Sequence, residues 1–293
     1  MPNPSSLSHA VLGRSSARSR RSAAGIGVAI VSVAALSVTS PTLAATSDPA
    51  TTVERTLKDP AIVESSGLAR SRYSDTRLWT HNDSGGGTTI FAIAESGRTK
   101  ARFELTGASH RDWEGMASAK RSGVSYLFVG DIGDNGSKRS NIYVHRVREP
   151  RPGASGRSLK PVTYAFKYPD GPHNAETLMV KPGSLRIYVV TKGKKQPGAI
   201  YAAPRSLSTK RVNVLRKIGP APAGMADGVF LDKSRFVLRG YESGWLYRNV
   251  DANPKRFPLP IKGESITTAW RKNYLFVGSE GRYSQVWRVR LPQ

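Results

Sequence analysis

Carboxylates recur at one position of a short segment that the chain repeats. Each copy begins with a polar or acidic residue, continues with a small and an aliphatic residue, and ends with a residue that is usually apolar: SGLA at 66–69, EGMA at 114–117, ETLM at 176–179, DGVF at 227–230 and ESIT at 264–267. The first residues of the copies are Ser66, Glu114, Glu176, Asp227 and Glu264. Ca²⁺ prefers oxygen ligands and takes about six to eight of them with loose geometry. If the fold brings the four acids together, they could hold a calcium ion.

Protein cations offer a second way to neutralise the same acids. Two unit charges about 4 Å apart repel by ~4 kcal/mol at an effective dielectric constant near ~20, so a ring of unpaired carboxylates is costly. Lys192 and Arg239 lie in the runs that follow the third and fourth copies, where internal salt bridges would also satisfy the acids. The sequence leaves both interpretations open.

A second group of oxygen ligands lies in the segment GDIGDNGS at 130–137. Asp131, Asp134 and Asn135 are closely spaced and flanked by glycines, which suits a hard cation. The spacing is not that of an EF-hand loop, and Asp-Asn-Gly is also the ordinary composition of a turn that bonds its own backbone. The pattern favours the turn, and Asp112 is expected to cap the loop before the second copy.

Two histidines lie in turns beside acids and are candidate general bases. His81 is next to Asp83, and His173 precedes Glu176. A structural, hydrogen-bonded role is the competing interpretation. The chain has no G-x-S-x-G segment, no H-E-x-x-H segment and no cysteine. Metal-assisted hydrolysis is therefore the only reaction class for which residues can be named.

The elements that must position these residues are short strands. Apolar runs rich in Val, Ile, Tyr, Phe and Trp alternate with Gly, Pro, Asn, Asp and Ser, which predicts an all-β fold. Each copy of the segment is followed by an aromatic-rich strand and a third strand, and a fourth strand is predicted in the first four copies at 101–106, 161–168, 211–218 and 255–261. This pattern predicts a β-propeller with five four-stranded blades, six being the alternative. The first strand of each blade lines the central channel, so the acids would form one ring.

The fifth copy lacks a fourth strand, and residues 51–59 (TTVERTLKD) have no other partner. We expect this N-terminal strand to complete the last blade and close the ring, which leaves no long sheet edge unpaired. Strand alternation predicts that Val53, Arg55 and Leu57 face one side, and Thr52, Glu54 and Thr56 the other. The insert at 149–160 is expected to lengthen the second copy.

The N-terminus resembles a secretory signal peptide. Four arginines precede an apolar stretch at 24–38, and we expect residues 1–44 to be removed, residues 45–50 to form a disordered leader and residues 51–293 to form a single propeller domain. The apolar stretch is shorter than the ~20 residues that span a bilayer, so the mature chain is expected to have no transmembrane segment. The absence of cysteine excludes a disulfide framework.

The chain is strongly basic, with 45 Lys and Arg against 21 Asp and Glu and a net charge of +24. Removal of the signal peptide takes away four arginines and no acid, which leaves a charge of +20. A soluble cationic surface is the simplest interpretation of this charge. The functional alternative is attraction to anionic cell-wall polymer, to phospholipid headgroups or to phosphorylated small molecules. No nucleic-acid-binding module is present, so nucleic acid is not an expected partner, and we expect a monomer.

The segments HNDSG, DWEGMA, LFVGDIGDN with IYVHRVREP, and YPDGPHNAETL are similar to a family of secreted actinobacterial β-propeller proteins. That family is grouped with WD40-like propellers and with the "esterase-like activity of phytase" proteins. The resemblance runs from about Val63 to Lys192 and implies export and a propeller. More distantly, the acids of the inner strands resemble those of the gluconolactonase and paraoxonase class, which implies calcium in the channel.

Two functions follow as hypotheses. The first is an exported binding or scaffold protein at the cell envelope, with a structural calcium ion in the channel. The second is a calcium-dependent hydrolase of esters, lactones or phosphoesters. In the second, Glu114, Glu176, Asp227 and Glu264 hold the ion while His81 or His173 transfers protons.

Overall fold

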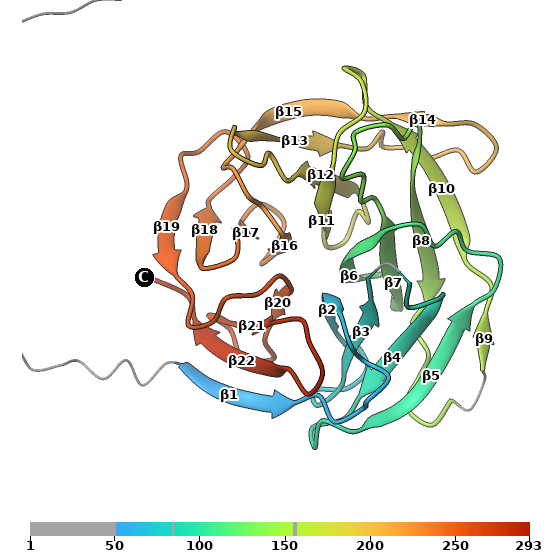
Figure 1. Ribbon diagram of the computed structural model, residues 1–293, viewed down its shortest axis with the longest axis vertical. Coiled ribbons are helices and arrows are strands. Elements are labelled where there is room, and N and C mark those ends of the chain that lie inside the picture. Colours follow the sequence, from blue (N-terminus) through green and yellow to red (C-terminus); the bar gives the residue numbers. More distant parts are fainter. Residues whose placement is uncertain (1–50, 84, 155–156) are drawn as a thin grey trace, which may run out of the picture. The chain divides into compact units, whose positions relative to one another are not determined.

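The computed structural model describes residues 51–83, 85–154 and 157–293. In these ranges every regular element is a β-strand, and the strands form five antiparallel sheets arranged in a ring (Figure 1). The prediction of five blades is therefore confirmed, and the six-blade alternative is not observed. The predicted signal peptide and leader, residues 1–44 and 45–50, lie outside the described residues. The described part of the chain contains no helix long and apolar enough to cross a membrane.

In the first four blades the four main strands run outward from the channel in sequence order, and in the fifth blade the outer strand comes from the N-terminal part of the described chain. The innermost strands are β2 (Ser65–Arg70), β6 (Trp113–Arg121), β11 (Ala175–Val180), β16 (Asp227–Phe230) and β20 (Ile266–Thr268). The second strands are β3 (Leu78–Asn82), β7 (Val124–Asp131), β12 (Ile187–Thr191), β17 (Phe236–Arg239) and β21 (Tyr274–Gly278). The third strands are β4 (Thr89–Ile93), β8 (Ile142–Arg148), β13 (Gly198–Ala202), β18 (Ser243–Tyr247) and β22 (Gln285–Arg290).

The outer strands are β5 (Thr99–Leu105), β10 (Val162–Lys167), β15 (Arg216–Ala221), β19 (Lys255–Pro258) and β1 (Thr51–Thr56). Two blades carry a fifth, two-residue strand that the sequence did not predict. β9 (Ser158–Leu159), from the insert at 149–160, pairs in parallel with β5 of the first blade. β14 (Asn213–Val214) pairs in parallel with β10 of the second blade. The prediction of one continuous strand at 211–218 is therefore wrong, because these residues are divided between β14 of the second blade and β15 (Arg216–Ala221) of the third.

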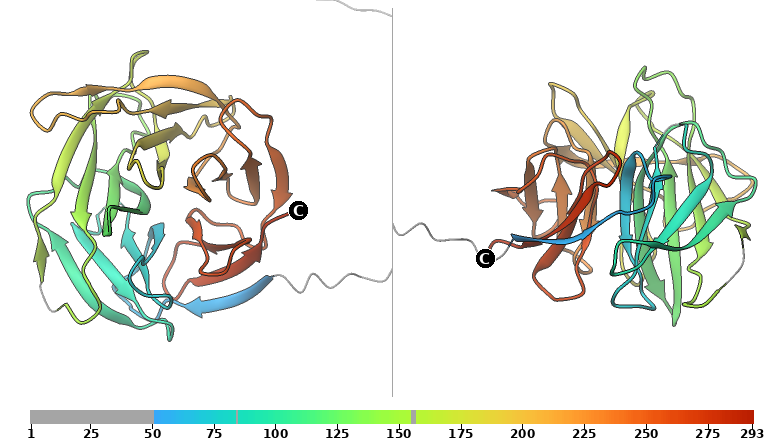
Figure 2. Two further views of the ribbon diagram at one scale, coloured as in Figure 1. Left: turned by 180° about the vertical axis from the view of Figure 1, so that it is seen from behind. Right: turned by 60° about the horizontal axis from the view of Figure 1, so that its bottom comes forward.

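The N-terminal strand closes the ring, as predicted. β1 pairs antiparallel with β22, so the last blade combines both ends of the described chain, which Figure 2 shows from behind and from a tilted view. The predicted alternation of its side chains is wrong at Val53, because a β-bulge between Val53 and Arg55 breaks the register. Val53 is consequently 44% exposed, whereas Arg55 and Leu57 are buried.

The core lies between neighbouring blades. Each of five apolar clusters joins side chains from two adjacent blades, such as Trp79 of the first and Trp113 of the second. Each innermost strand also contacts the next one around the channel. This packing holds the beginnings of the innermost strands close together, where the repeated acids lie.

Candidate metal centre in the central channel

Three of the repeated carboxylates converge. Glu114 of β6, Glu176 of β11 and Glu264, just before β20, each place one carboxylate oxygen within 4.8 Å of the others. A second group, formed by Asp83, Asp112 and Glu114, meets the same limit and shares Glu114. A cation bound by the first group would therefore be held by three blades, and a cation bound by the second group by two.

The small residue of the repeated segment explains how the inner strands come so close. A Cβ atom added to Gly115 would lie 2.5 Å from the backbone nitrogen of Leu178 in the next blade. A Cβ atom at Gly67 would lie 2.7 Å from the backbone nitrogen of Met116. Glycine is required at both positions because the backbones of neighbouring blades fill the space that a side chain would need.

Burial gives the central carboxylates unusual proton affinity. Glu114 is 4% exposed and accepts a hydrogen bond of 3.2 Å from Ser66 Oγ. Burial, together with the nearby carboxylates Glu176, Asp83 and Asp112, raises its pKa to about 11. Without a cation, Glu114 is therefore protonated at neutral pH, and a cation would displace that proton.

Glu176 is the second buried acid of the group. Burial raises its pKa to about 7, although hydrogen bonds from Lys192 and Asn174 oppose that shift. Both of these groups contact Oε1, and Oε2 is buried with no hydrogen-bond partner among the described residues. A buried carboxylate oxygen without a donor is costly, and a metal ion is one group that would satisfy it.

Of the two cations expected near the acids, one pairs with them. Lys192 Nζ forms an ion pair with Glu176 Oε1. Arg239 is fully buried but donates its hydrogen bonds to backbone carbonyls, at 2.6 Å to Ser265 and 3.0 Å to Gly278. Of the two cations, only Lys192 therefore forms a salt bridge with a repeated acid within the described residues.

Asp227, the fourth acid of the predicted ring, is absent from both converging groups. Its two oxygens accept hydrogen bonds from the backbone amides of Gly228, at 2.8 Å, and Ile266, at 2.9 Å. Burial raises its pKa well above the usual value. In this position Asp227 connects the fourth blade to the fifth.

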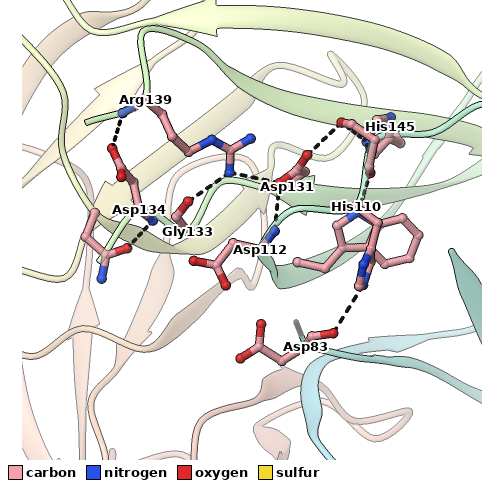
Figure 3. Close-up of polar contacts among 11 residues, drawn as sticks. Asp83, His110, Asp112, Asp131, Gly133, Asp134, Arg139 and His145 are labelled. Atoms are coloured by element: carbon pink, nitrogen blue, oxygen red, sulfur yellow. Dashed lines mark hydrogen bonds and ion pairs between the residues drawn. The ribbon is translucent and has the colours of Figure 1, made fainter. Parts of the chain in front are cut away.

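The predicted loop ligands point to other partners (Figure 3). Asp131 pairs with Arg139 Nη1 at 2.8 Å and accepts hydrogen bonds from Ser109 Oγ and the Asp112 backbone amide. Asp134 accepts a hydrogen bond from the Arg139 amide at 2.7 Å. The Asn135 side-chain oxygen accepts one of 3.2 Å from Asn174. Protein donors from within and outside the loop therefore occupy these side chains, and their role as metal ligands stays a prediction.

The two candidate general bases lie outside both carboxylate groups. His81 is fully buried, its Nδ1 lies 2.9 Å from the Asn82 carbonyl, and burial lowers its pKa to about 4. His173 is partly exposed and lies 3.1 Å from Asp170 and 3.2 Å from the Tyr201 hydroxyl. Their catalytic role stays a prediction.

Sequence reasoning missed three acids at the channel. Asp83 and Asp112 complete the second group, although Asp112 was expected only to cap a loop. Glu280 lies beside Glu264, and burial together with that neighbour raises its pKa to about 8. Asp83 and Glu280 follow the ends of the second strands β3 and β21, so a search of that repeated position would have found them.

No family model matches the chain, and none of the curated proteins matches its sequence. Among solved structures, a gluconolactonase from Xanthomonas campestris, XC5397, is 15% identical with a TM-score of 0.44, over 81% of this chain and 89% of that one. YCF48 from Cyanidioschyzon merolae is 10% identical with a TM-score of 0.39, over 82% and 98% of the two chains. Both are distant from this chain, and neither defines its ligand. Membership of the actinobacterial family stays a prediction.

Proposed function

We propose that this propeller is an exported binding protein of the cell envelope, with a calcium ion at the mouth of its channel. One observation carries the proposal: acids and bases are segregated. Among the described residues seven carboxylates are buried, at Asp59, Glu114, Asp131, Asp134, Glu149, Glu176 and Asp227, against three buried arginines. The interior therefore concentrates acidic groups, several of them with raised pKa values, and the outer surface is more basic than the composition alone implies.

The carboxylates at the channel support a calcium site. Glu114, Glu176 and Glu264 supply oxygens from three blades, and Lys192 is the cation that pairs with them. Asp83 and Asp112 add further oxygens beside Glu114. Several carboxylates with loose geometry suit Ca²⁺ better than Mg²⁺, which demands a near-ideal octahedron and usually keeps several waters.

Calorimetric titration of Ca²⁺ into chelator-treated protein tests the proposed calcium site. We expect saturable binding to the native protein and a loss of at least about tenfold in affinity, or about 1.4 kcal/mol, in Glu176→Gln and Glu264→Gln. Glu95→Gln, which changes an exposed acid outside both groups, is the matched control. Native protein that takes up no Ca²⁺ at millimolar concentration, or equal losses in all three variants, would exclude the site.

The basic residues of the outer surface support an anionic polymer as the partner. A cleft of about 810 Å³ runs beside β5 and is lined by Arg77, Lys100, Arg102 and Arg157 against the single acid Glu104. Such a surface attracts polyanions through charge rather than through sequence-specific contacts. The cleft is the part of the surface that we assign to the polymer.

A calcium-dependent hydrolase is the second candidate, because a cation held by Glu114, Glu176 and Glu264 could polarise the scissile group of an ester, lactone or phosphoester. Ester, lactone and phosphoester substrates tested with and without EDTA would decide it. Activity that is abolished by EDTA and by Glu114→Gln supports this function, whereas activity insensitive to EDTA excludes it.

A further inference from the structure

A small basic pocket lies beside the acid cluster, at the edge of the third blade. It has a volume of about 290 Å³ and is lined by the β12–β13 loop, by β13 and β15, and by residues that precede β11. Three lysines, Lys192, Lys194 and Lys217, line it, and no carboxylate does. The pocket is close to the volume that encloses a small ligand.

The charges of these lysines are only partly neutralised. Lys192 pairs with Glu176 on the channel side, and Lys217 lies 3.8 Å from Asp170, a long and exposed ion pair. Lys194 is exposed and forms no ion pair within the ranges that the structure describes. An exposed pair of this kind contributes little, so the pocket keeps a positive potential.

Two further polar groups are fixed in the wall. Tyr201 donates hydrogen bonds of 2.8 and 3.0 Å to the Asp170 carboxylate, and His173 Nε2 lies 3.1 Å from the same group. Tyr168 packs edge-on against both rings, at centroid distances of 5.0 Å from His173 and 4.9 Å from Tyr201. Hydrogen bonds and ring contacts therefore fix the positions of His173 and Tyr201, while the lysines supply the positive charge.

We infer that this pocket binds the phosphate group of a small molecule. Lysine recognises phosphate as a point charge, and three lysines from two elements line a space that is large enough for a compact anion. The inference goes beyond the proposed function, because it assigns a second ligand at a separate pocket. It also holds if the channel binds no cation.

Titration of inorganic phosphate and of a phosphomonoester, glycerol 3-phosphate, into the full protein in a phosphate-free buffer tests the inference. We expect both to bind, and Lys194→Gln and Lys217→Gln each to raise the Kd by roughly threefold to tenfold. Lys195→Gln is the matched control, because it removes the same charge from the next residue, which does not line the pocket. Thermal melts of all three variants check that they fold.

Three outcomes would overturn the inference. The first is native protein that binds neither phosphate nor the monoester. The second is an equal loss in Lys194→Gln and Lys195→Gln, which would assign the binding to general surface charge. The third is binding of a phosphodiester polymer alone, which would assign the phosphate affinity to the cleft beside β5.

Discussion

At the scale of single residues, the buried carboxylates divide into two kinds. Glu149 is fully satisfied: it accepts hydrogen bonds from Ser71 Oγ, the Arg72 amide, Trp79 Nε1 at 2.9 Å and Ser125 Oγ at 2.6 Å. Glu176, in contrast, keeps one oxygen without a donor. The first kind holds blades together, and the second kind leaves room for a ligand.

Replacement of Glu149 should therefore destabilise the fold without affecting calcium. Glu149→Ala leaves several buried donors unsatisfied, and we expect a loss of about 3 kcal/mol in the free energy of unfolding. Urea denaturation measures it, with the exposed Glu95→Ala as the control. A loss below about 0.5 kcal/mol would mean that water replaces the carboxylate.

The raised pKa values of the channel acids predict a dependence of stability on pH. Glu176 and Glu280 have folded-state pKa values of about 7 and about 8, above the ~4.3 of an unfolded glutamate. The folded state therefore binds more protons, so the stability that these groups contribute is present at low pH and is lost as pH rises through 7 and 8.

Melting temperatures of the metal-free protein between pH 7 and pH 9 measure this effect. The window lies above the titration of His81 and His145, whose pKa values burial lowers to about 4. We expect the melting temperature to fall with pH, and Ca²⁺ to raise it more at pH 9 than at pH 7. Glu114, whose pKa of about 11 lies above this window, stays protonated in the folded state and adds to the fall. A flat profile in the metal-free protein would therefore contradict the assigned protonation of all three glutamates.

At the scale of elements, β1 is the strand on which the ring depends. Arg55 donates hydrogen bonds to the carbonyls of Thr76, at 2.9 Å, and Ala94, at 2.8 Å, and Leu57 is 1% exposed in the cluster between the first and last blades. The strand therefore joins two blades as well as completing one.

A protein that begins at Asp59 lacks this strand, and we expect it to lose several kcal/mol of a typical ~5–15 kcal/mol stability. A protein that begins at Pro49 keeps the strand and should melt like the mature chain that begins at Ala45. Thermal melts of the three chains compare them. Equal melting temperatures would show that β22 does not need its outer partner.

Much of the element order could be predicted, because alternating strands and turn residues leave a clear periodicity. The repeat at Glu114, Glu176 and Glu264 predicted their convergence, since the first strand of every blade faces the channel. Local sequence could not show β9 and β14, because two-residue parallel pairings depend on how neighbouring blades pack. Local sequence also could not show that backbone amides donate hydrogen bonds to both oxygens of Asp227, or that a β-bulge turns Val53 outward.

At the scale of the whole molecule, charge segregation predicts how the protein is retained on anionic polymer. We expect retention on purified cell wall at low salt and release as salt rises, because the Debye length falls from ~10 Å at 0.1 M to ~3 Å at 1 M. Lys100→Glu, in the cleft beside β5, should elute at lower salt than Lys233→Glu, an equal charge change at an exposed position outside the cleft. Equal elution would assign retention to the whole surface.

The pairing of β1 with β22 also sets the order in which the molecule can fold. Arg288 donates a hydrogen bond to Thr52, a residue 236 positions earlier in the chain. A growing polypeptide must therefore keep β1 unpaired until β22 has been synthesised, and contacts of such sequence separation form slowly. During that interval the first and last blades expose apolar faces and open edges, which are prone to aggregation. We expect such a protein to require assistance from chaperones before its ring closes.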